Sequence, residues 1–135
     1  MSLFTVARAL LAVLALLMAA FTLPAYMNPT SNPGLVHLSG EALSLGNTAG
    51  AFLGRQLTVI LIAFIGVFSG HRLLIAIGGF GMAFMNGHDA FFMGFMGGSG
   101  ATAIAGLVLA VIGLVIVFIA LRKTAPQRAG EESAG

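Results

Sequence analysis

The sequence predicts an all-α integral membrane protein, a four-helix transmembrane bundle with a longer, partly helical loop between helices 1 and 2. Apolar residues make up 59% of the 135 residues and charged residues 7%, whereas soluble domains carry about 25% charged residues. Mean hydropathy is +1.05. The apolar residues gather in four runs, each near the length of about 20 residues that a helix needs to cross a bilayer. We expect one transmembrane domain over residues 1–123.

The first apolar run, residues 3–23, ends at Pro24. A cleaved signal peptide is the alternative interpretation, because Arg8 precedes an apolar core of suitable length. No clean small-x-small cleavage site follows before Pro24, so we expect a retained span. If this run were removed, three spans would remain and the two termini would lie on opposite sides of the membrane.

Three further spans follow after one long connection, residues 25–50. They are predicted at residues 51–69, 73–95 and 101–121. Only Gly70-His71-Arg72 separates the second span from the third, and a glycine-rich turn separates the third from the fourth, so these helices should be antiparallel neighbours. In the connection, apolar residues from Leu35 to Leu45 suggest a modest amphipathic helix. The polar tail, residues 124–135, should be disordered.

Basic residues predict the orientation of the chain. With four spans both termini share one side, and the basic residues near the span ends fall on it: Arg8, Arg72, Arg122, Lys123 and Arg128. The positive-inside rule makes that side cytoplasmic, so we expect a multi-pass protein of the cell inner membrane with both termini in the cytoplasm. The net charge of +2 therefore reads as a topology signal, and no nucleic-acid partner is expected. The absence of cysteine excludes disulfides and thiol chemistry.

One carboxylate lies in an apolar environment. Between Arg55 and Arg122 the only formal charges are Arg72 and Asp89, and a charge at membrane depth costs roughly 2.5–3.5 kcal/mol on insertion scales. Arg55 precedes His71 by sixteen residues and Asp89 follows it by eighteen. At the helical rise both lie about 24–27 Å from the turn. They should therefore occupy similar depths near the outer face.

Other polar residues could join this pair. Asn86 lies three residues before Asp89 and shares its helix face, while His88 is adjacent to Asp89. The predicted ligand-binding or buried polar cluster consists of Arg55, Asp89, His88, Asn86, Glu41 and His37. Three interpretations stay open: a salt bridge that orients the hairpin, a role in ligand binding or proton transfer, and side chains that snorkel to the interface.

We expect no metal and no cofactor. The spacing of His37 and Glu41 is common by chance, and a metal site would have to draw His88 from a separate segment. A two-histidine haem site is disfavoured because His71 lies on the opposite side from His37 and His88. The methionines Met82, Met85, Met93 and Met96 are typical of packing. No phosphate-binding, metalloprotease or nucleophile-elbow motif is present, so no catalytic residues are expected and an enzyme is not favoured.

Glycines spaced four residues apart lead into the second span at Gly46, Gly50 and Gly54. Such spacing lets helix backbones approach closely in a membrane. It fits tight packing within the bundle, or a face for a homo-oligomer or a larger membrane complex.

The order of these motifs resembles the DoxX-like group of small four-helix membrane proteins. The resemblance rests on Gly54-Arg55 at the second span, Gly70-His71-Arg72 at the turn and Asn86-Gly87-His88-Asp89 in the third span, followed by a glycine-rich turn and a final apolar span. It covers residues 50–123. It implies the four-helix fold and links to accessory roles in quinone or thiosulfate oxidation, or to relatives that are uncharacterised.

Three functions are compatible with this sequence. The first is a non-enzymatic accessory subunit or small-ligand binder with a polar cluster near the outer face. The second is a small transporter or proton-coupled permease in which Asp89 titrates. The third is a redox accessory protein that binds quinone or haem between helices. In each case the surrounding partner is the lipid bilayer.

Overall fold

The computed structural model describes residues 2–95 and 100–122, and these residues form an all-helical chain. Four long helices follow one another: α1 (Leu3–Ala25), α2 (Thr48–Ser69), α3 (Arg72–Phe95) and α4 (Gly100–Leu121). The all-α prediction with four helices is confirmed. The predicted disordered tail, Lys123 and Arg128 lie outside the described residues, as does the predicted glycine turn apart from Gly100.

Three segments of the described chain are long and apolar enough to cross a membrane: Leu3–Ala25, Gly40–Ser69 and Gly100–Leu121. The helix α3 is not among them. Its second half carries Asn86, His88 and Asp89, and these three residues lower the hydropathy of an otherwise apolar helix. The prediction of four apolar helices is thus confirmed for three.

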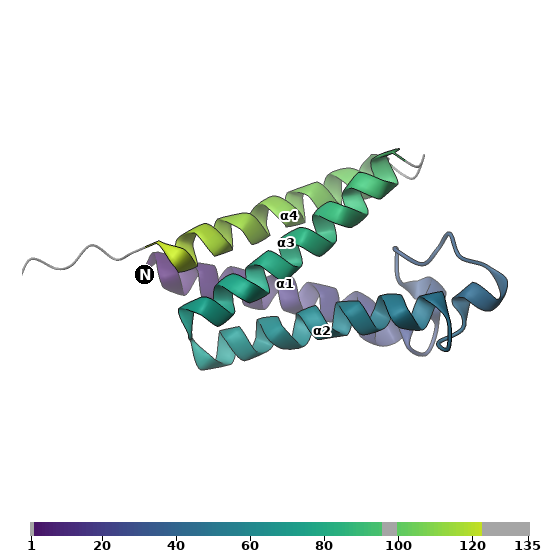
Figure 1. Cartoon of the computed structure of the whole chain (residues 1–135), viewed down its shortest axis with the longest axis horizontal. Coiled ribbons are helices and arrows are strands. Elements are labelled where there is room, and N and C mark those ends of the chain that lie inside the picture. The colour runs from purple at the N-terminus through teal and green to yellow at the C-terminus, as the bar shows by residue number, and fades with distance from the viewer. Residues whose placement is uncertain (1, 96–99, 123–135) are drawn as a thin grey trace, which may run out of the picture.

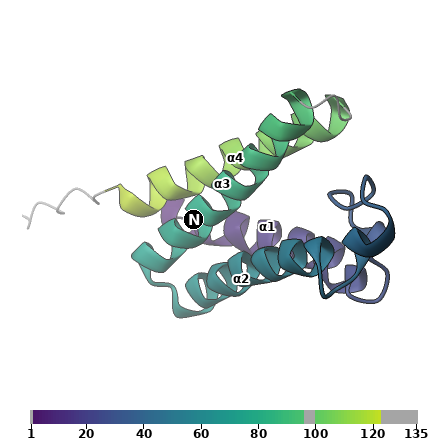
Figure 2. The ribbon, with the colours of Figure 1, turned by 45° about the vertical axis from the view of Figure 1, so that its right-hand side comes forward.

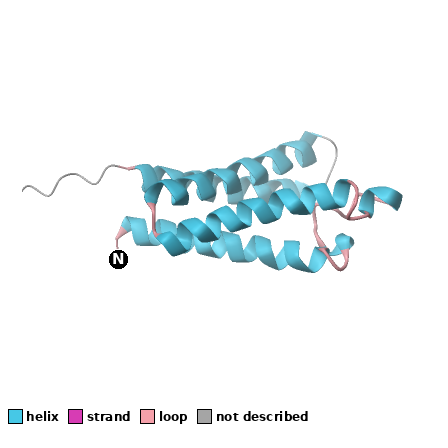
Figure 3. Cartoon of the chain, turned by 60° about the horizontal axis from the view of Figure 1, so that its bottom comes forward, coloured by secondary structure: helices cyan, strands magenta, loops and turns pink. Residues whose placement is uncertain are grey.

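The helices form two hairpins. Figures 1 and 2 show α1 with α2, and α3 with α4, and the two hairpins diverge toward one end of the molecule. That end carries the connection between α1 and α2, residues 26–47, and is called the connection end. The opposite end carries the turn at Gly70, the N-terminus and the end of α4, and is called the turn end (Figure 1). Figure 3 shows the four helices running lengthwise between these ends.

The turn end is held by two arginines that hydrogen-bond to the last carbonyls of other helices. Arg8 of α1 donates from Nε to the carbonyl oxygen of Val67 and from Nη2 to that of Phe68 at 3.4 Å. Arg72 donates from Nη1 to the carbonyl oxygen of Arg122 at 3.0 Å. Cations at a helix C-terminus satisfy free carbonyls and interact favourably with the helix dipole. Both basic residues thus have structural roles.

The main core lies between the hairpins and is built from small and medium apolar side chains. Its buried members are Ala7, Leu11, Leu14, Ala15, Met18, Ile60, Ala63, Ile75, Ala76, Met82, Ile116 and Ala120. On α1, α2 and α4 they recur three or four residues apart, which is the period of one buried helix face. All four helices therefore share one core.

Glycines set the distance between α3 and α4. A Cβ on Gly113 would lie 2.7 Å from the carbonyl oxygen of Gly79 and 2.8 Å from the backbone nitrogen of Ala83. A Cβ on Gly106 would lie 2.9 Å from the carbonyl oxygen of Asn86. These contacts are with backbone atoms, so the two helices touch directly, as small-residue packing in membranes allows. This hairpin is the most extensively packed pair.

The predicted glycine stripe does not bring the helices of this bundle together. A Cβ on Gly50 would collide with the backbone of Leu45, in the connection, while Gly54 has no atom within 4 Å of that position. A Cβ on Gly46 would approach only the hydroxyl of Ser44, at 3.7 Å. Its use as a face for a second copy or a larger complex stays a prediction.

The predicted amphipathic helix in the connection is wrong. The structure has two short 3₁₀ turns there, Pro29–Ser31 and Gly40–Leu43. Ser39 is extended and Gly40 has φ +57°, a left-handed conformation that interrupts a right-handed helix. The connection instead folds back on the bundle through Leu35, which is 1% exposed and packs with Ala25 and Leu53.

Candidate ligand-binding cleft

Two cavities open between the diverging hairpins toward the connection end. One, of about 370 Å³, lies between α2 and α3. The other, of about 420 Å³, lies among α1, the connection, α2, α3 and α4. Both are lined by Phe52, Gln56 and Asp89, so they meet at these residues. The two cavities together are called the cleft.

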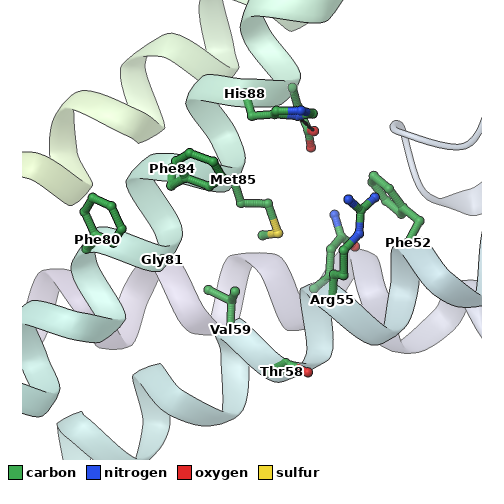
Figure 4. A pocket seen from close by; sticks show the side chains of 11 residues that line it. Phe52, Arg55, Thr58, Val59, Phe80, Gly81, Phe84, Met85 and His88 are labelled. Atoms are coloured by element: carbon green, nitrogen blue, oxygen red, sulfur yellow. Dashed lines mark hydrogen bonds and ion pairs between the residues drawn. The ribbon is translucent and has the colours of Figure 1, made fainter.

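The walls of the first cavity are largely apolar. Figure 4 shows Phe80, Phe84 and Met85 on α3, with the Met85 side chain reaching toward α2, where Val59 and Phe52 lie. The rings of Phe80 and Phe84 are 58% and 65% exposed. The cavity is therefore open at the surface of the bundle, on the side where the apolar face of α3 lies.

The structure brings the predicted pair Arg55 and Asp89 to this first cavity. Both line it, as equal depths on neighbouring antiparallel helices had suggested. They do not form an ion pair: among the described residues the ion pair within 4.0 Å joins His88 Nδ1 and Asp89 Oδ1, at 3.3 Å. The Arg55 guanidinium carbon instead lies 5.9 Å from the centre of the Phe52 ring, an arrangement that allows a cation–π contact.

His88 belongs to an aromatic row on α3. Its ring lies 6.2 Å from that of Phe84 and 4.6 Å from that of Phe92, measured between centroids. Its side chain is 46% exposed, and that of Asp89 is 37% exposed. His88 therefore contributes to the outer rim of the cleft, where it hydrogen-bonds to Asp89.

Asn86 lines the second cavity, whereas His37 and Glu41 line neither. The Asn86 Nδ2 donates to the carbonyl oxygen of Met82 at 2.8 Å. His37 and Glu41 are exposed on the connection, and no helix holds them on one face. The predicted cluster of six is thus divided: four members line the cleft and two do not. The described residues hold no group of three His, Cys, Asp or Glu that could bind a metal ion.

Sequence reasoning missed a buried polar network beside the cleft. Gln56 Oε1 accepts hydrogen bonds from Thr22 Oγ1 and from Asn32 Nδ2, both at 2.9 Å. Gln56 is 9% exposed, Asn32 2% and Thr22 0%. The network links α1, the connection and α2. A signal was present for one member, because Gln56 shares the 3.6-residue period of the buried Leu53 and Ile60 on α2.

Hydrogen bonding determines the orientation of these amides. The backbone N–H of Gly34 can only donate, and it donates to Asn32 Oδ1 at 2.9 Å. Asn32 must therefore present Nδ2, a donor, to Gln56, and Gln56 must present its oxygen in return. The Gln56 Nε2 is left as a donor. No hydrogen bond joins it to any residue that the structure describes, and Gln56 lines both cavities.

The cleft thus combines apolar walls with a small set of polar groups, which include the basic Arg55, the neutral amide of Gln56 and the acidic Asp89. Comparison with known proteins finds no family model, no curated protein and no solved structure that matches this chain. The DoxX-like resemblance therefore rests on the quoted motifs alone. Any functional assignment has to follow from the chemistry of the cleft.

Proposed function

We propose that this chain is a small multi-pass protein of the inner membrane that binds a small amphiphile in the cleft, as a non-enzymatic ligand binder or accessory subunit. The observation that carries this proposal is the pair of cavities that meet at Gln56 and Asp89. Their volumes lie within the range of about 300–1,000 Å³ typical of small-molecule sites, which are mostly apolar with a few placed polar groups.

The outer surface supports a membrane location. Large apolar side chains are exposed along every helix, for example Val13 at 61%, Phe68 at 78% and Phe118 at 69%. Soluble proteins rarely expose continuous apolar surface on this scale. In the proposed topology α3 also crosses the membrane, as the third of four spans, and its polar residues Asn86 and Asp89 line the cleft rather than the lipid, as intramembrane polar residues usually do.

The cleft opens where an amphiphile would enter. The exposed rings of Phe80 and Phe84 border the first cavity, so a lipid-phase molecule can reach it sideways from the bilayer. Its hydrocarbon part would contact apolar walls. Its polar end would reach Arg55, Gln56 and Asp89, which lie in the first half of α2 and the second half of α3, toward the connection end.

A tryptophan reporter tests this proposal. The chain has no tryptophan, so Phe52→Trp places a single reporter on the wall that both cavities share. The protein is reconstituted in lipid nanodiscs and titrated with a panel of brominated dodecyl amphiphiles, because bromine quenches a nearby indole. We expect at least one member to give saturable quenching. Leu61→Trp is the control: Leu61 is 53% exposed and lines neither cavity, so its quenching should rise without saturation.

Filling the cleft should abolish the saturable signal. Ala105 lines the second cavity and is exposed on α4, so Ala105→Phe, added to the Phe52→Trp chain, should obstruct the site with little strain. Val108→Phe is the matched control, since Val108 is 52% exposed and lines neither cavity. Equal quenching in the two variants, or no saturation by any probe, would contradict ligand binding in the cleft.

A second candidate function is proton-coupled transport. Asp89 favours it, because this carboxylate is shared by both cavities and is the only acidic residue in α3. Proteoliposomes with a trapped pH-sensitive dye and an imposed pH gradient test it. Proton flux that disappears in Asp89→Asn would support transport; flux equal to that of empty liposomes would leave the binder as the function.

A further inference from the structure

An amide donor with no hydrogen-bond partner among the described residues faces the cleft. The side chain of Gln56 is held by two hydrogen bonds, and both are accepted by Oε1. The Nε2 hydrogens have no acceptor among the described residues, although Gln56 is 9% exposed and lines both cavities. Among the described residues no buried side-chain nitrogen or oxygen atom lacks a hydrogen-bond partner, so Gln56 Nε2 is open to the cleft and available to a ligand that offers an acceptor.

A free acceptor lies at the same junction. Asp89 uses Oδ1 in its contact with His88. Its second carboxylate oxygen accepts no hydrogen bond from the residues that the structure describes, and Asp89, like Gln56, lines both cavities. The junction therefore offers one donor and one negatively charged acceptor. Measured along the helix axes, Gln56 lies about 12 Å from the first residue of α2, and Asp89 lies about 9 Å from the last residue of α3. Both of these helix ends lie at the connection end (Figure 1), so the two residues lie at similar depths in the bundle.

Few head groups satisfy both residues. A carbonyl or an ether oxygen accepts from Gln56 but gives nothing to Asp89. An ammonium group donates to Asp89 but cannot accept from Gln56. A carboxylate or phosphate would accept from Gln56 and pair with Arg55 at the rim, yet it would stand beside the charge of Asp89. A hydroxyl group accepts and donates through one atom.

We propose that the cleft selects amphiphiles whose polar end is a hydroxyl group, that is, alcohols of the lipid phase. The hydroxyl oxygen accepts from Gln56 Nε2 and its hydrogen is donated to Asp89, while the hydrocarbon part lies along the apolar walls formed by Phe52 and Met85. This inference rests on the proposed binding function and adds the head group to it. A site built to hydrogen-bond a hydroxyl group discriminates strongly against analogues that lack it.

Matched head groups on one chain test this selection. The Phe52→Trp chain is titrated with brominated dodecyl probes that end in a hydroxyl, a methyl ether, a carboxylate or no polar group, at known mole fractions in the bilayer. We expect the alcohol to bind about tenfold more tightly than the ether, and the ether more tightly than the alkane, as one hydrogen bond each would give. Native mass spectrometry of the unsubstituted chain should give the same order.

Substitutions then assign each preference to one residue. Asp89→Leu removes the acceptor and should bring the alcohol and the ether to equal affinity. Asp89→Asn keeps an acceptor oxygen and should retain part of the preference. Gln56→Leu removes the donor and should bring the ether and the alkane together; thermal unfolding of this variant checks that the loss of the bonds to Thr22 and Asn32 has not unfolded it.

The outcomes separate this inference from the function on which it rests. If no probe saturates, binding in the cleft is itself wrong. If all probes saturate with similar affinity, the cleft binds amphiphiles but does not select a hydroxyl group, and the inference is overturned. Tightest binding of the carboxylate probe, lost in Arg55→Gln, would also overturn it, because Arg55 rather than the junction would then select the head group.

Discussion

Adding one methyl group at Gly113 should separate α3 from α4. The new Cβ would lie 2.7 Å from the carbonyl oxygen of Gly79, 2.8 Å from the nitrogen of Ala83 and 2.9 Å from its Cβ. Two of these three atoms belong to the backbone and cannot rotate away. To restore an ordinary contact of 3.4 Å, the helices must move apart by about 0.7 Å, since close-packed interiors have no free space to absorb the methyl group.

The cost follows from two opposing effects. Overpacking of a well-packed site typically costs about 1–3 kcal/mol. Replacement of glycine by alanine within a helix returns up to about 1 kcal/mol, because alanine has the better helix propensity. Gly54→Ala provides the matched control: it is the same substitution within α2, at a position where no atom lies within 4 Å of the added Cβ. The two variants should therefore differ by about 1–3 kcal/mol, with Gly113→Ala the less stable.

Thermal unfolding in detergent, followed by circular dichroism, measures this difference. At about 4 °C per kcal/mol for a chain of this size, Gly113→Ala should melt about 4–12 °C below Gly54→Ala. The comparison between variants cancels effects of the detergent that are common to both. Equal melting temperatures would show that α3 and α4 do not touch at Gly113, and the helix spacing in this structure would then be wrong.

Three further outcomes are expected. Arg8→Gln should lower the melting temperature more than Arg128→Gln, because Arg8 satisfies the last carbonyls of α2 whereas Arg128 lies in the polar tail. Melting temperatures of Arg55→Gln, Asp89→Asn and the double variant should be nearly additive, since no ion pair joins the two side chains; recovery in the double variant would reveal one. A cytoplasm-active reporter fused after Gly135 should be active, whereas activity of a periplasm-active reporter fused at the same position would contradict the four-span topology.

Much of the fold could be predicted because its signals are local. The lengths of the apolar runs and the glycine turn at Gly70 placed four helices within a few residues of their observed bounds. The start of α2 was missed by three residues, because Asn47 caps it by accepting from the Thr48 backbone nitrogen at 2.8 Å, and a capping side chain is easily missed beside a stronger apolar pattern. In the connection, a weak amphipathic period predicted a helix, but the left-handed backbone of Gly40 interrupts that segment.

The sequence could predict how far along the bundle the candidate-site residues lie, but not the direction in which their side chains point. Helix rise and the position of one turn placed Arg55 and Asp89 near one level, and both line one cavity. Rise alone does not say which way a side chain points, so Arg55 lies over Phe52 instead of beside Asp89. Gln56 was passed over because it is neutral, and its partner Asn32 reaches it only through the fold of the connection, which has no periodic signal.

The two ends of the bundle are suited to different tasks. At the turn end, Arg8 caps α2, Arg72 caps α4, and a Cβ on Gly66 would lie 2.9 Å from the backbone of Leu74, so little space is left between the hairpins. At the connection end the hairpins diverge, and the space between them holds polar groups whose hydrogen bonding is incomplete. A charge at membrane depth lowers stability. Tight packing at the turn end offsets that cost, so changes there should alter stability more than ligand selection. Changes at Asp89, which lies outside the buried network of Thr22, Asn32 and Gln56, should do the reverse.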